Sequence, residues 1–335
     1  MSIDSLKGGE KATIPARVSI VPDPEMEPIA ITSAAKEDEE KLNRFWVALL
    51  VAFLGMVGVL LTITGGNGGF QGLLVAILLH TVPGLTIAVV YRLRGLDLIL
   101  SWFVGSLAVL ILCSLPMALT SFWHPRVMAT LILLASTAVA VWVACKRPPT
   151  LEATWMRRTG RAMVGPIGLS TAGFLVAVLA AALQPQSPAL YGAALAAGPL
   201  WFLGLGAIVF AVCWAFSSVG GRSWSIVLLA TVVPMSQAVM YGTPTVQVAA
   251  RHLGIVNLLI THGGLDRGAG IYQAYSGLFA SSALVQQAAG WPDLMMYAAV
   301  FGAVGAGVNC LAVAQLARYF VDDERAWWAG LVFAL

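Results

Sequence analysis

The sequence predicts an all-α, polytopic transmembrane helical bundle of about eight to nine spans. Of its 335 residues, 59% are hydrophobic and 10% are charged, whereas a soluble domain carries about 25% charged residues. Apolar stretches near the roughly 20 residues that a helix needs to cross a bilayer recur from Trp46 onward. Because the hydrocarbon core has no water to bond backbone N–H and C=O groups, these stretches must be helical.

Eight apolar stretches are long enough to span, and a ninth is not. The eight expected spans are residues 46–63, 73–91, 98–119, 127–145, 167–183, 193–214, 225–241 and 294–317. The run at residues 327–335 is too short for a hydrocarbon core of about 30 Å. It is either a surface helix or the start of a further span in a longer protein, and the second interpretation is favoured.

Composition divides the chain into three regions. Residues 1–43 are polar, with four prolines and a dense charge run at 36–41, and predict a disordered cytoplasmic tail that is helical at most near the first span. Residues 44–224 form a six-span membrane region. Residues 225–335 form a further core segment with a long outer loop at 242–293, and we expect this segment to be truncated at its C-terminus.

Lysine and arginine predict the orientation. With the tail in the cytoplasm, the outer loops contain only Arg126, Arg251 and Arg267 of the 19 Lys and Arg residues, as the positive-inside rule requires. We therefore expect a multi-pass protein of the cell membrane with a cytoplasmic N-terminus. The net charge of +3 is small and lies in membrane-flanking loops, so the expected partners are membrane lipids and not nucleic acid.

The long outer loop contains two moderately apolar pieces, residues 246–261 and 275–289. The second piece includes several Ser and Gln residues, which make it too polar for a confident span. Both pieces are typical of helices that lie in the membrane interface. The alternative makes 275–289 a short or re-entrant span, which would invert everything that follows it.

His80 is the one ionisable side chain well inside a predicted span. Such groups can mark ion pathways, but a proton relay needs a second titratable group at similar depth, and no carboxylate is there. This argues against a proton-coupled transporter. We interpret His80 as a neutral side chain that bonds a neighbouring helix beside the kink at Pro83.

Two carboxylates, Asp266 and Asp293, lie on the predicted outer side. Asp293 resembles a cap of the following helix. Asp266 lies in a glycine-rich stretch where His262 could converge with it as acid or base, and where Arg267 could bind a phosphate. The alternative is a solvated turn with a local Asp–Arg pair. His252 fits a structural role in a juxtamembrane helix better than a catalytic one.

Several short motifs resemble the core of large actinobacterial membrane proteins related to the GT-C glycosyltransferases. A span ending at Tyr241 precedes His252-Leu253-Gly254, His262-Gly263 and Ile271-Tyr272. The resemblance covers about residues 225–335, a third of the chain. It includes the segment from Tyr275, where those proteins often have Trp-Pro-Gly-Phe-Phe, and the loop from Arg318.

Two positions depart from that pattern. Gly270 stands where those proteins often have an acid before Ile-Tyr, and Tyr275-Ser276 stands in place of Trp-Pro. The site is therefore altered, or part of it lies outside this chain.

The resemblance implies a membrane glycosyltransferase that takes sugar from a polyprenyl-phosphate-linked donor on the outer face, in cell-envelope polysaccharide or glycolipid assembly. It makes Asp266 the first candidate for a catalytic base or metal ligand and His262 the second. The expected substrate-binding residues are Arg267, His252, Tyr272 and Tyr275. The cofactor stays open, and a divalent metal ion is compatible with this chemistry.

Two other function classes fit the same sequence. A transporter or flippase of lipid-linked or hydrophobic substrates needs no carboxylate, and it is favoured by Pro83, Gly84 and the small residues at 171–206, which permit close helix packing. A non-catalytic membrane scaffold is the third interpretation.

Overall fold

The structure, a computed structural model, describes residues 27–65, 68–93, 95–146, 161–184, 196–217, 221–244, 247–266 and 276–335. Within these residues the regular structure is helical throughout, and eight helices are long and apolar enough to cross a membrane. The predicted fold class is confirmed. The eight candidate spans are Phe45–Ile63, Gly69–Tyr91, Gly95–Thr120, Pro125–Lys146, Gly165–Ala182, Gly198–Ser217, Arg222–Tyr241 and Met295–Ala317.

Two of these spans are built from more than one helical segment. The second span joins two helices, and the third joins two helices through a π-helical turn, η1. The helices are α1 (Glu27–Ile63), α2 (Gly69–Leu79), α3 (Val82–Tyr91), α4 (Gly95–Leu100), η1 (Ser101–Gly105), α5 (Ser106–Thr120), α6 (Pro125–Lys146), α7 (Arg161–Ala182), α9 (Gly198–Ser217), α10 (Arg222–Tyr241), α11 (Gln247–His262), α12 (Gly277–Ala289), α13 (Met295–Ala317) and α14 (Asp323–Ala334).

The first helix begins earlier than the sequence suggested. α1 starts at Glu27, well ahead of the span that begins at Phe45, so the latter part of the predicted disordered tail is helical. The charge run at 36–41 is rich in Glu and Lys, which are good helix formers, and the membrane helix behind it provides the nucleus. The rest of the predicted tail, residues 1–26, lies outside the described residues.

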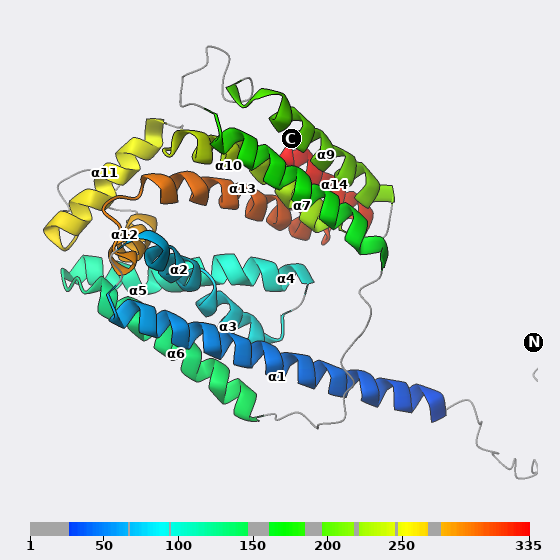
Figure 1. The fold of residues 1–335 in the computed structure, drawn as a ribbon. Coiled ribbons are helices and arrows are strands. Elements are labelled where there is room, and N and C mark those ends of the chain that lie inside the picture. The colour runs from blue at the N-terminus through cyan, green and yellow to red at the C-terminus, as the bar shows by residue number, and fades with distance from the viewer. Residues whose placement is uncertain are drawn as a thin grey trace, which may run out of the picture.

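The helices form two lobes, each with its own apolar core (Figure 1). In the first lobe α1 packs along α6, and α12 packs against α2, α5 and α6. In the second lobe α7 packs along α9, while α10 packs against α7 and α13. α14 completes the second lobe by lying against α13 and α10. The lobes thus group the helices differently from the sequence division at residue 224.

Small residues bring helices close together within the second lobe. A Cβ atom on Gly173 of α7 would lie 2.7 Å from the carbonyl oxygen of Gly204, and one on Gly204 of α9 would press on the carbonyl oxygen of Gly173. Both glycines are therefore needed for the backbone approach of α7 and α9. This is the close packing that the small residues at 171–206 suggested.

The two apolar pieces of the long loop are helices at the same end of the bundle. α11 lies across this end of the bundle at a steep angle to the spans (Figure 1). We call this end of the bundle the α11 end. α1 and α5 end there, and α2, α6 and α13 begin there. α12 has 13 residues, a length of about 20 Å, which is short of a bilayer core. α12 packs inside the first lobe and against α11, and its buried residues include Ala280 and Leu284.

Candidate functional site

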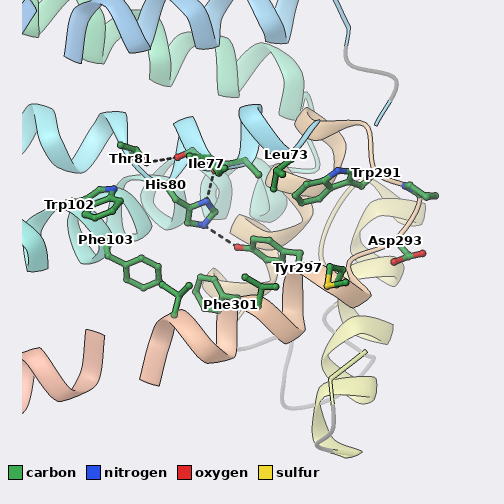
Figure 2. Close-up of a pocket in the computed structure, with 15 residues that line it drawn as sticks. Leu73, Ile77, His80, Thr81, Trp102, Phe103, Trp291, Asp293, Tyr297 and Phe301 are labelled. Atoms are coloured by element: carbon green, nitrogen blue, oxygen red, sulfur yellow. Dashed lines mark hydrogen bonds between the residues drawn. The ribbon is translucent and has the colours of Figure 1, made fainter. Parts of the chain in front are cut away.

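A groove lies between the two lobes, alongside the candidate membrane spans (Figure 2). Its volume is about 580 Å³, within the roughly 300–1,000 Å³ of typical ligand sites. It extends from Trp291 and Asp293 at the α11 end to His80 near the middle of its span. The lining residues are Leu73, Ala76, Ile77, His80, Thr81, Trp102, Phe103, Trp291, Pro292, Asp293, Met296, Tyr297, Val300, Phe301 and Val304.

His80 lies at the break between α2 and α3. Pro83 follows in the first turn of α3, and because proline lacks an N–H it cannot continue the hydrogen-bond ladder of α2. His80 Nδ1 lies 2.9 Å from the carbonyl oxygen of Ala76, and Nε2 lies 3.0 Å from the hydroxyl of Tyr297. A carbonyl only accepts, so Nδ1 carries the proton and Nε2 accepts from Tyr297 in the neutral ring.

The π-helical turn supplies two aromatic side chains to the groove. Trp102 and Phe103 both belong to η1. A Cβ atom on Gly84 of α3 would press on the carbonyl oxygens of Ser101 and Trp102, so only glycine lets α3 approach this turn. Ser106 Oγ accepts a hydrogen bond of 2.8 Å from the N–H of Gly84 and fixes the contact. Turns of this kind occur frequently at functional sites.

A rigid corner closes the groove at the α11 end. Gln286 of α12 donates from Nε2 to the carbonyl oxygen of Pro292 at 3.1 Å, and the N–H of Trp291 donates to the carbonyl oxygen of Gln286 at 3.1 Å. Asp293 Oδ1 accepts from the N–H of Met295 at 2.9 Å. Asp293 thus satisfies the N–H of the first residue of α13, but the N-cap is Leu294 and not, as the sequence suggested, Asp293.

The groove is apolar and accessible from the lipid side. Ile77, Trp102 and Met296 keep 48%, 41% and 48% of their surface exposed, although all three lie within candidate spans. Aromatic rings cover much of the remaining wall, with Tyr297 and Phe301 5.5 Å apart between ring centroids. A mostly apolar wall of this kind is suited to a hydrocarbon chain, with His80, Thr81, Asp293 and Tyr297 as its polar side chains.

A second, more polar cavity of about 520 Å³ adjoins the groove and shares Trp291 with it. Gln287 organises this cavity, because its side-chain Oε1 accepts from Trp123 Nε1 at 2.7 Å and its backbone oxygen accepts from Arg126 Nε at 3.3 Å. We call it the Arg126 pocket. Its lining residues are Trp123, His124, Pro125, Arg126, Val127, Gln287, Gly290 and Trp291.

The two acid–base candidates from the sequence lie at the α11 end but outside both cavities. His262 and Asp266 are exposed, and His262 Nδ1 lies 2.9 Å from the carbonyl oxygen of Leu258 in the preceding turn of α11. The turn between them packs on the end of α5, where the N–H of Leu265 donates to the carbonyl oxygen of Ala118 at 3.1 Å. A Cβ atom on Gly263 would lie 3.8 Å from Trp123 of the Arg126 pocket.

Of the other candidate residues, the structure describes His252. His252 is half-buried on α11 with its ring 5.2 Å from the ring of Phe279 of α12. Arg267, Tyr272 and Tyr275 lie outside the described residues. In the described part of the chain, no group of three or more His, Cys, Asp or Glu side chains is arranged to hold a metal ion.

Sequence reasoning missed most of the groove. Tyr297, Trp102 and Trp291 belong to it, and the one available signal was His80, which needed a polar partner on another helix. Comparison of the chain with protein-family models, curated proteins and solved structures finds no match.

Proposed function

We propose that this chain acts on a lipid-linked substrate whose hydrocarbon chain lies in the groove between the lobes. The observation that carries the proposal is the apolar groove itself, which begins at the α11 end and reaches His80 at mid-membrane. A lipid-linked substrate keeps its chain in the membrane and its polar group at the surface. A site for it needs an apolar wall at depth and polar groups at one end, and this arrangement matches that need.

Within that class, we propose transfer of a sugar from a polyprenyl-phosphate donor at the outer surface. Asp266 removes the proton of an acceptor hydroxyl, whose oxygen forms a bond to the anomeric carbon. The bond from that carbon to the phosphate oxygen breaks, and polyprenyl phosphate leaves with its electron pair. The position of Asp266 supports this role, since it is exposed on a turn that packs against Trp123 beside the Arg126 pocket.

His262, on the last turn of α11, is the proposed second acid–base group. The proposed orientation, with the α11 end outside the cell, follows the low number of Lys and Arg residues at that end.

Movement of a lipid-linked substrate without chemistry is the second candidate function. It is favoured by the division into two lobes with the groove between them, because transporters that alternate access rock one bundle against another around a site near the midplane. The hydrogen bond from Tyr297 to His80 is then a contact that breaks when the lobes move.

The decisive experiment measures sugar transfer in membranes that contain the protein, with a panel of radiolabelled polyprenyl-phosphate sugars. Asp266→Asn keeps the shape and removes the base, so we expect transfer to fall by at least 100-fold. Asp97→Asn, at the opposite end of the bundle, is the matched control and keeps its activity. Unchanged transfer by Asp266→Asn removes Asp266 from catalysis. Movement across vesicles without a covalent product supports the transport function instead.

A further inference from the structure

We infer that the Arg126 pocket binds the phosphate of a lipid whose apolar chain lies in the groove, so that the two cavities hold one molecule. This inference rests on the proposed function, because it assigns the polar group of the same substrate. The occupant is an amphiphile with a phosphate group and a hydrocarbon chain.

The first support is that the two cavities meet at one side chain, Trp291. Its ring lies 6.0 Å from the ring of Tyr297 on the groove side. A Cβ atom on Gly72 would lie 2.8 Å from Trp291 Nε1, so the indole packs closely on α2 and is held there. A ligand that passes this indole has its chain on one side and its polar group on the other.

The second support is charge. Arg126 Nε donates to the backbone oxygen of Gln287, which holds the guanidinium, and its terminal N–H groups have no hydrogen-bond partner among the described residues. A guanidinium binds phosphate oxygens in pairs. Among the described residues that line the pocket there is no carboxylate to compete. His124, a second polar side chain, lies beside Arg126 on the same wall.

The third support is the position of Arg126 at the end of a candidate span. Arg126 lies in the first turn of α6, at the end of a span, where the backbone N–H groups of a helix also favour an anion. The groove supplies no Lys or Arg of its own. Among the described residues that line the two cavities, Arg126 is the one Lys or Arg side chain.

Farnesyl phosphate tests both halves of the site, because farnesol carries the same chain without the phosphate. The measurement is binding of each radiolabelled probe to the full chain in phosphatidylcholine nanodiscs, with empty nanodiscs to subtract partition into lipid. We expect Arg126→Gln to weaken binding of farnesyl phosphate by about 10- to 100-fold, since it removes charge-assisted hydrogen bonds. Farnesol binding stays unchanged and shows that the variant is folded.

Two further variants separate the pocket from general effects. Arg251→Gln removes the same charge at the α11 end without touching the pocket, and it should leave both probes unaffected. Val300→Trp fills the groove and should weaken both probes together. Arg126→Lys keeps the charge but cannot donate two parallel hydrogen bonds to the phosphate. Its affinity for farnesyl phosphate should therefore lie between that of Arg126→Gln and that of the wild type.

Each outcome has a defined meaning. Equal binding of farnesyl phosphate and farnesol, or an equal loss in Arg126→Gln and Arg251→Gln, overturns the phosphate site while the groove stands. Failure of both probes to bind overturns the groove and with it the proposed function. A phosphate preference that depends on Arg126, together with unchanged sugar transfer in Asp266→Asn, supports the phosphate site and removes only the proposed catalytic residue.

Discussion

The hydroxyl of Tyr297 lies 3.0 Å from Nε2 of His80 and joins α13 of the second lobe to the end of α2 in the first. His80 is fixed in turn by Ala76, whose carbonyl oxygen accepts from Nδ1. The bond lies on the wall of the groove (Figure 2). Both the stability of the bundle and the relative position of its lobes should depend on it.

Breaking this bond should show coupling between the two residues. Tyr297→Phe removes the hydroxyl and His80→Leu removes the ring nitrogens, and we expect each to lower the free energy of unfolding by about 1 kcal/mol. The double variant should lose less than the sum, with a coupling of about 0.6–1 kcal/mol. Reversible unfolding in mixed micelles measures this cycle. Strictly additive losses would mean that the two groups do not interact.

Gly84 should be among the least replaceable glycines. In Gly84→Ala the new methyl group meets the carbonyl oxygens of Ser101 and Trp102, and backbone atoms cannot move aside as a flexible side chain can. We expect a loss of about 1–3 kcal/mol in unfolding free energy, measured in the same micelles.

The matched control for Gly84→Ala is Gly302→Ala on α13. A Cβ atom there meets nothing within 4 Å, so the change should be neutral or stabilising by up to about 1 kcal/mol through helix propensity. If the two variants had equal stability, the close approach of α3 to η1 would be wrong.

The spans were predictable because the bilayer imposes a length and a composition on each of them. Eight apolar runs near 20 residues gave eight candidate spans, with boundaries that differ by a few residues. The hydrogen bond of Asp293 to the start of α13 was also predictable, since an acid before an apolar run can satisfy the first N–H groups of a helix, although the N-cap itself is Leu294. Both features depend on residues that are neighbours in the sequence, so they can be predicted from the sequence alone.

The groove was not predictable, because it depends on which helices meet. His80 indicated a polar contact with another helix, but nothing near Tyr297 in the sequence marks it as the partner 217 positions away. The π-helical turn that presents Trp102 and Phe103 lies within an unbroken apolar run with no local signal. The start of α1 was misplaced for a different reason, since a charged segment continues a helix that the membrane span nucleates.

The start of α13 should respond to the shape of residue 293 more than to its charge. Asp293→Ala loses the hydrogen bond to the N–H of Met295, and we expect a loss of about 0.5–2 kcal/mol in unfolding free energy. Asp293→Asn keeps an oxygen at the same place and should remain near the wild-type value. Unfolding titrations of the two variants compare them directly, and equal losses would indicate that the carboxylate charge matters instead of the hydrogen bond.

Orientation in the membrane provides the last prediction, because the proposed chemistry needs the α11 end outside. Thr261 is exposed on α11, and Cys145 is exposed at the far end of α6. In a chain whose other cysteines are replaced by alanine, a maleimide that cannot cross the bilayer should label Thr261→Cys in intact cells. It should reach Cys145 only after the cells are permeabilised, and permeabilised cells should show both positions labelled. Labelling of Cys145 but not of Thr261→Cys in intact cells would place Asp266 in the cytoplasm, away from a donor on the outer face, and would refute the proposed transfer reaction while leaving the groove intact.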